Sequence, residues 1–233
     1  MLLASNSPRR RELLAFTGLP FSVAAADVDE SILPDEAPAD YVLRLAEAKA
    51  RACCPSRPPL APPASEGRTS PINEKRLTVI GSDTAVVDAR EILGKPRDAR
   101  EAESMLRQLR GRTHQVYTAI AAYRPQDGKL LTELCISDVH MRAYSDDELA
   151  AYVQSGDPLD KAGGYGIQHP DFHPIENFDG CQASVMGLPM CHLVRLLKEM
   201  DILPAVDVPE TCQSALKYQC SISHAVLRGE NIG

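Results

Sequence analysis

Two long runs of β-type residues, 116–122 and 130–141, flank an Asp-Gly pair at 127–128, and this arrangement limits the folds open to the chain. Asp-Gly between such runs is a strong signal for a β-hairpin, whose strands are antiparallel. Shorter β-type runs, at 2–4 and 77–80, are interleaved with helical patterns, an order typical of parallel strand pairs. The sequence therefore predicts an α/β fold with a mixed sheet flanked by helices.

Several helix starts are marked by capping residues. Ser7 followed by Pro8 places a hydroxyl N-cap before a proline at the first helical position. Asp98 can cap a helix that ends near Gly111, and residues 145–148 have the spacing of a capping box. These signals predict three helices with defined beginnings.

The segment 42–53 has apolar residues at i, i+3 and i+4 spacing, which predicts an amphipathic helix. Lys49 falls on the apolar stripe of this helix. A lysine in that position either extends its ammonium group to solvent or reaches into a pocket that holds an anion. The pattern alone leaves both readings open.

Residues 55–72 contain six prolines, together with Ser, Gly and Arg, and cannot build a core. We interpret this stretch as an insertion within one domain, residues 1–202. A last helical pattern covers 189–200. The polar segment 203–233 has weak periodicity, and as a C-terminal tail it could be loose or docked.

The composition excludes several classes of protein. With 32 acidic against 25 basic side chains, the formal charge is −7, so stable nucleic-acid binding is not expected. No apolar run reaches the length of a membrane span. The seven cysteines are odd in number and lack C-x-x-C spacing, which argues against a disulfide framework and a zinc site. We expect reduced thiols in a cytoplasmic protein.

The start of the first helix has the chemistry of a phosphate site. Ser7, Arg9, Arg10 and Arg11 surround a helix N-terminus that directly follows a strand. Free backbone N–H groups, the helix dipole and guanidinium groups all favour an anion there. Without an anion, three arginines would oppose the helix dipole. The cluster therefore indicates binding of phosphate.

Two carboxylates stand out as candidate magnesium ligands. Glu30 lies in an acidic loop, which taken alone is usually just solvated. Asp83 interrupts an apolar, strand-like segment, where aspartate is disfavoured. Mg²⁺ prefers one or two carboxylates together with substrate phosphates, so the pair would suit a phosphorylated ligand.

The loop 158–168 contains three glycines, which let a backbone approach a ligand closely. It would bring Lys161 and Gln168 to the same place, although a flexible surface turn is the alternative. Lys95, between Gly94 and Pro96, adds another lysine at a turn, and it could equally be a surface residue.

The familiar nucleotide motifs are absent from the sequence. There is no G-x-x-x-x-G-K-[ST] and no G-x-G-x-x-G after a strand. His169 and His173 lie in a Pro-rich loop, and we interpret them as surface residues, not as a metal pair. No Ser/His/Asp arrangement is evident.

Taken together, blocks spread over residues 2–200 resemble the Maf family in their order along the chain. The blocks are residues 5–14, 29–30, 49–50, 81–84, 94–96, 111–114, 160–163 and 185–189. The chain departs from the family pattern at Ser82 and Gly164, where alanine is common. The insertion, the segment 169–182 and the tail are also less typical.

This resemblance implies a two-lobed, ITPase-like α/β fold around a central cleft, usually in homodimers. It implies a nucleoside triphosphate pyrophosphatase, in which water attacks the α-phosphorus with help from a divalent cation, Mg²⁺ or Mn²⁺. Glu30 and Asp83 would be the metal and water-activating carboxylates, with Asp83 as general base. By the same resemblance, four residues bind substrate and its phosphates: Ser7, Arg9, Lys49 and Lys95.

Residues 165–168, Tyr-Gly-Ile-Gln, resemble the branch of the family that acts on dTTP and UTP. In that branch Arg10, Lys95 and Gln168 would contact the pyrimidine. A glutamine amide can accept from N3–H and donate to O4 of uracil or thymine, but turned over it can also pair with cytosine. The alternatives are a 7-methyl-GTP pyrophosphatase and a binding protein that regulates septum formation and cell division.

Overall fold

The computed structural model describes residues 1–54, 77–230 and 232, so the predicted insertion at 55–72 lies outside the described residues. Within them, one six-stranded sheet has the order β2-β1-β3-β5-β6, and β4 pairs with β3. β1 is parallel to β2 and β3, whereas β3, β5 and β6 are antiparallel, so the predicted mixed sheet is confirmed. The strands are β1 (Leu2–Ala4), β2 (Ser22–Ala24), β3 (Val79–Asp88), β4 (Glu91–Leu93), β5 (Thr113–Arg124) and β6 (Lys129–His140).

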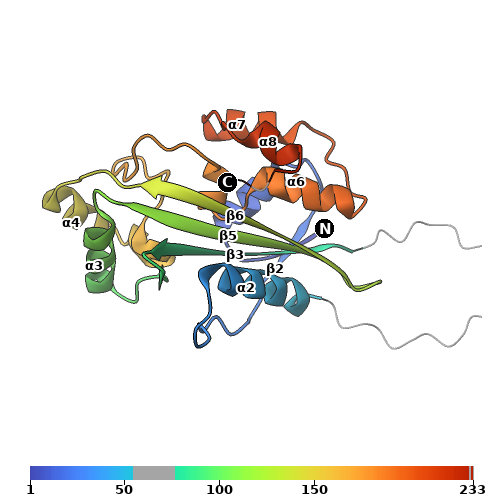
Figure 1. Ribbon diagram of the computed structural model, residues 1–233, viewed down its shortest axis with the longest axis horizontal. Helices are drawn as coiled ribbons and strands as arrows, with labels where there is room; N and C mark the ends of the chain where they lie inside the picture. The colour runs from blue at the N-terminus through green and yellow to red at the C-terminus, as the bar shows by residue number, and fades with distance from the viewer. Residues whose placement is uncertain (55–76, 231, 233) are drawn as a thin grey trace, which may run out of the picture.

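Helices cover both faces of the sheet and one end of its long strands. In Figure 1, α2 lies on one face, α6, α7 and α8 lie on the other, and α3 and α4 sit at the end of the long strands. The α-helices are α1 (Pro8–Ala15), α2 (Pro38–Ala52), α3 (Ala99–Leu109), α4 (Asp146–Gln154), α5 (Gln182–Val185), α6 (Met190–Glu199), α7 (Val208–Leu216) and α8 (Ser223–Leu227). Two 3₁₀ turns, η1 (Asp157–Asp160) and η2 (Ala162–Gly164), follow α4.

The predicted helix starts are confirmed by their caps. The Ser7 hydroxyl accepts a hydrogen bond from the Arg10 amide at 3.4 Å, and the Asp98 carboxylate caps α3 through the Glu101 amide. The predicted capping box of α4 is complete, with both of its reciprocal hydrogen bonds present. These short-range signals fix the starts of α1, α3 and α4.

The cleft of the protein begins at a gap along one edge of β3. β1 is short and pairs with β3 only at Val79 and Ile80, while β4 pairs with the same edge from Val86 onward. Between these two points, none of the described strands pairs with that edge, although β5 continues along the other side. Asp83 and Thr84 therefore lie where the sheet is open to a ligand.

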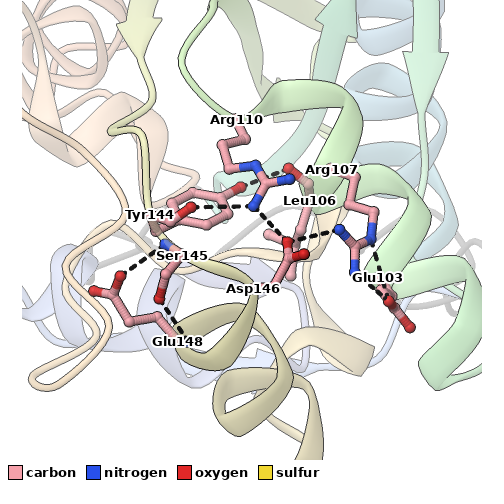
Figure 2. A network of polar contacts seen from close by, with 8 residues as sticks. All are labelled: Glu103, Leu106, Arg107, Arg110, Tyr144, Ser145, Asp146 and Glu148. Carbon is pink, nitrogen blue, oxygen red and sulfur yellow. Dashed lines mark hydrogen bonds and ion pairs between the residues drawn. The ribbon is translucent and has the colours of Figure 1, made fainter.

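A second core lies at one end of the long strands, includes Val86, Val116 and Val139 of those strands, and forms the other lobe. It is built from α3, α4 and the segments after them, around Leu106, Tyr144 and Phe172. Figure 2 shows how charges join the two helices: Asp146 Oδ1 accepts from Arg107 and from Arg110, each at 2.7 Å. This lobe holds α4 firmly against α3.

The segment after residue 202 docks on the main core. The side chains of Val208 and Val226 are buried, and α7 and α8 both pack against α6. Tyr218 also accepts the Gly180 amide at 3.1 Å, which ties the segment to the loop before α5. Of the two arrangements that the sequence left open, the docked one is observed.

Two further observations bear on the class of protein. In the described part of the chain, no helix is long and apolar enough to cross a membrane. All seven cysteines are free thiols.

Candidate active site

A cleft of about 770 Å³ opens between the two lobes at the gap in β3. It is lined by the β1–α1 loop, by residues of α2 and β3, and by the Gly-rich loop after α4. Residues that are more than 150 positions apart in the sequence therefore share one site. All nine predicted site residues line it: Ser7, Arg9, Arg10, Glu30, Lys49, Asp83, Lys95, Lys161 and Gln168.

Lys49 lies between the two predicted carboxylates. Its Nζ atom is 2.5 Å from Glu30 Oε1 and 2.6 Å from Asp83 Oδ1. Lys49 comes from α2 and Asp83 from the middle of β3, while Glu30 comes from the loop between β2 and α2. The lysine is only 7% exposed, so it reaches into the pocket and not to solvent. The three groups form one compact charge cluster.

The two carboxyl groups differ in their electrostatic environment. Burial raises the pKa of Asp83, and the charges of Lys49 and Arg10 only partly offset this effect. Burial also acts to raise the pKa of Glu30, but the hydrogen bond and charge of Lys49, together with the charges of Lys95 and Arg10, outweigh it, so that pKa lies below its usual value. Because a higher pKa makes a carboxylate the stronger proton acceptor, Asp83 is the better suited of the two to act as a base.

The donor set of Glu30 and Asp83 fits a hard divalent cation. Mg²⁺ binds oxygen ligands and commonly uses one or two carboxylates, with substrate phosphates and water completing its shell. Among residues 1–54, 77–230 and 232, no group of three or more His, Cys, Asp or Glu is arranged to hold a metal alone. A cation at this pair would therefore take its remaining ligands from a bound phosphate and from water.

The start of α1 places two arginines at the cleft. Arg10 donates through Nε to the Gly187 carbonyl at 2.9 Å and through Nη2 to Thr84 Oγ1 at 3.1 Å. Burial lowers the pKa of Arg10, and the charge of Asp83 works in the opposite direction. Arg9 is only weakly paired, with its Nη1 3.7 Å from Asp160 Oδ2. The fixed Arg10 thus forms part of the cleft wall, while Arg9 reaches across the cleft.

The Gly-rich loop is docked by contacts that need glycine. Gly163 has φ 67°, and a Cβ there would lie 2.9 Å from the Val86 side chain. Its amide donates to the Gly94 carbonyl at 3.0 Å. This contact holds the loop that carries Gln168 against the segment that carries Lys95, so both exposed side chains face one cleft.

Lys161 is engaged within its own loop. Its ammonium group donates to the Asp157 carbonyl at 2.7 Å and is 2.9 Å from the Asp157 carboxylate. Asp160 Oδ1 lies 2.6 Å from the same nitrogen. These contacts stiffen the cleft wall, and a direct role of Lys161 toward substrate stays a prediction.

The structure adds cleft residues that the sequence reading did not single out. Thr84 and Tyr41 line the cleft, and the Tyr41 hydroxyl donates to the Glu30 carbonyl at 3.0 Å. Thr84 belongs to the block 81–84 that resembles the family, whereas the only sequence signal of Tyr41 is its place in the same helix as Lys49. His169, interpreted from the sequence as a surface residue, is half-buried and lines the cleft beside Gln168.

The fold and the cleft define an α/β protein with a mixed sheet and two lobes, with carboxylates and cations meeting between them. A family model described as Maf-like protein matches residues 1–200, and the chain belongs to the Maf family. The family resemblance read from the sequence is thereby confirmed.

Curated relatives cover most of the chain. A dTTP/UTP pyrophosphatase of Hahella chejuensis is 44% identical over 202 residues, which cover 87% of this chain and 92% of the relative. A dTTP/UTP pyrophosphatase of Geobacter sulfurreducens is 42% identical over 204 residues, which cover 87% of this chain and 97% of the relative. A third dTTP/UTP pyrophosphatase, from Methylobacillus flagellatus, is 43% identical over 202 residues, which cover 86% of this chain and 92% of the relative.

Proposed function

We propose that this chain is a nucleoside triphosphate pyrophosphatase that hydrolyses dTTP and UTP to the nucleoside monophosphate and pyrophosphate. The observation that carries the proposal is that Glu30 and Asp83 both form ion pairs with Lys49, in a cleft that is also lined by further cations. A triphosphate brings about four negative charges, which such cations and a metal ion can offset. The names of the similar proteins support the same reaction and the same substrates.

In this proposal Asp83 is the general base. Its carboxylate accepts a proton from the water whose oxygen bonds to the α-phosphorus, while the bond from that phosphorus to the bridging oxygen breaks. Pyrophosphate leaves with the bridging oxygen. Lys49, which donates to Asp83 Oδ1 at 2.6 Å, holds the carboxylate in place for this step. The reaction needs no covalent enzyme intermediate.

Glu30 and Asp83 together hold a divalent cation, Mg²⁺ or Mn²⁺, in the proposed complex. When bound, such an ion neutralises phosphate charge as it builds up on the leaving pyrophosphate. The remaining phosphate charge is met by one hydroxyl and by positive side chains. We assign this role to Ser7, Arg9, Lys49, Lys95 and Lys161.

Selection of the base is assigned to Gln168, together with Arg10 and Lys95. The Gln168 amide can accept from N3–H and donate to O4 of uracil or thymine. Arg10 is held in the cleft by its hydrogen bond to Thr84, and Lys95 is exposed at the same cleft. In this proposal one amide and two cations contact the pyrimidine.

Two other readings compete with this proposal. A 7-methyl-GTP pyrophosphatase would use the same carboxylates with another base. A regulatory binding protein for septum formation would have no use for a base and a metal pair at a buried lysine.

The family resemblance also supports a homodimer, which light scattering would detect as twice the mass of one chain.

A nucleotide panel tests the proposed substrates. With Mg²⁺ or Mn²⁺ present, we expect dTTP and UTP to give the highest kcat/KM, about tenfold or more above 7-methyl-GTP, since the larger purine would not place its hydrogen-bonding groups against the Gln168 amide. Release of pyrophosphate is measured for each nucleotide. Preference for 7-methyl-GTP would overturn the substrate assignment. A folded chain that binds a protein partner and turns over no nucleotide would overturn the enzyme.

A further inference from the structure

His169 presents one unused hydrogen-bond donor at the cleft. Its Nδ1 atom accepts from the Phe172 amide at 3.0 Å and from the Asp171 amide at 3.3 Å. Because both partners are donors, Nδ1 carries the lone pair, and the neutral ring has its proton on Nε2. No hydrogen bond joins Nε2 to any residue in the described part of the chain. The Nε2–H group is therefore available to a ligand.

Aromatic contacts fix the orientation of this ring. The His169 ring packs edge-on against Tyr152, with centroids 4.8 Å apart and an interplanar angle of 70°. Tyr152 is in turn stacked on Phe172 at 4.2 Å and 13°. Tyr144 also packs against Phe172, with ring centroids 4.7 Å apart. The contact with Tyr152 and the hydrogen bonds to Nδ1 limit rotation of the His169 ring, so the direction of its Nε2–H group is fixed.

The support behind these contacts is itself rigid. Tyr152 lies on α4, whose first residue, Asp146, is bound by Arg107 of α3 and by Arg110, the residue that caps α3 (Figure 2). Arg110 also donates to the Tyr144 carbonyl at 3.1 Å, so both aromatic supports share one anchor. The orientation of His169 is thus part of the second lobe and not a property of a mobile loop.

The same tyrosine positions the loop on the other side of Gln168. The Tyr152 hydroxyl accepts from the Gly166 amide at 3.1 Å and donates to Asp157 Oδ2 at 2.7 Å. Gln168 therefore lies between two segments that Tyr152 holds. Any ligand that Gln168 contacts comes close to His169 as well.

The place of His169 in the cleft favours contact with the nucleoside half of a substrate. Asp157 and Asp160 line the cleft near it, and their charges are met by Lys161 and, 3.7 Å from Asp160, by Arg9. His169 directly follows Gln168, the residue assigned to the base, whereas Lys49 lies beside Asp83, where the reaction is placed. The His169 donor is therefore placed beside the base site.

We propose that His169 is a specificity-determining residue, whose Nε2–H donates to an oxygen of the bound nucleoside, on the base or on the sugar. The inference rests on the proposed nucleotide reaction and adds a contact beyond Gln168. The Nε2–H group is a neutral donor whose orientation is fixed before the ligand binds. A ligand that lacks an acceptor at this place leaves the donor unpaired and therefore binds more weakly.

Two substitutions at His169 distinguish the role of Nδ1, which holds the loop, from that of Nε2, which would contact the ligand. In His169→Asn, the side-chain oxygen can still accept the loop amides as Nδ1 does, but nothing reaches the position of Nε2. In His169→Gln, the longer side chain can bring an N–H donor to that position. We expect His169→Asn to keep the wild-type melting temperature and to raise the KM for UTP about 5- to 30-fold, with kcat within about threefold. His169→Gln should recover most of this loss.

Inorganic tripolyphosphate and α,β-methylene-UTP complete the test. The inhibition constant of tripolyphosphate should stay within about twofold in both variants, because the contact is to the nucleoside. A comparison of UTP with dUTP and 4-thio-UTP separates the sugar from the base. An unchanged KM in folded His169→Asn, an equal loss in both variants, or a parallel loss of tripolyphosphate inhibition would each overturn the proposal. If the wild-type chain failed to cleave UTP, the proposed function would fail, and binding of α,β-methylene-UTP to the same variants would still decide the role of His169.

Discussion

Replacing Asp83 with asparagine should lower kcat for UTP by a factor of about 10² to 10⁴, the range that a positioned general base contributes. The amide has the shape of the carboxylate and can still accept a hydrogen bond from Lys49, which now lies 2.6 Å from Asp83 Oδ1. It can neither take a proton from water nor supply negative charge to a metal ion. Steady-state release of pyrophosphate measures the loss.

Asp88 gives a matched control for this substitution. It lies in the same strand, is 5% exposed against 6% for Asp83, and is bound by Arg112 at 3.0 Å. It does not line the cleft. Asp88→Asn should therefore keep kcat within about threefold, since the chemistry takes place elsewhere. An Asp83→Asn enzyme that retained most of its turnover would remove Asp83 from the role of base.

Replacing Gly81 with alanine should destabilise the fold by about 3 kcal/mol or more, or prevent folding altogether. A Cβ at this position would lie 2.1 Å from the Ala46 carbonyl oxygen and 2.7 Å from the Ala50 nitrogen. Both atoms belong to the backbone of α2, so no side-chain rotation can relieve the clash. Either α2 or β3 must move, and Lys49 and Asp83 would move with them. Urea unfolding followed by circular dichroism gives the free energy.

Gly94→Ala is the control for this second prediction. A Cβ at Gly94 would meet nothing within 4 Å, and its φ lies outside the left-handed region. The same added methyl group should therefore change the unfolding free energy by less than about 1 kcal/mol. Equal stability of the two variants would show that α2 is not packed on β3 as described.

Local signals in the sequence were sufficient for much of the fold. The caps at Ser7, Asp98 and Ser145 predicted helix starts because their hydrogen bonds span only three residues. The hairpin was predicted because a two-residue turn signal separates two strand patterns. Asp83 drew attention because aspartate is disfavoured inside a strand, and it lies in the middle of β3.

Long-range geometry was not available from these signals. The gap along β3 depends on where β1 ends and β4 begins, which no local pattern encodes. The apolar stripe of α2 left the direction of Lys49 open until its distance from Asp83 was known. The prolines near His169 favour a surface residue, and no local pattern shows that Tyr152 of α4 packs against its ring.

The central claim is that water attacks the α-phosphorus of a pyrimidine nucleoside triphosphate in this cleft. Cleavage of UTP in H₂¹⁸O with Mg²⁺ or Mn²⁺, followed by mass spectrometry of the products, tests it most directly. The account predicts UMP and pyrophosphate, with one ¹⁸O atom in UMP and none in pyrophosphate. Formation of UDP and phosphate, or ¹⁸O in pyrophosphate, would contradict it.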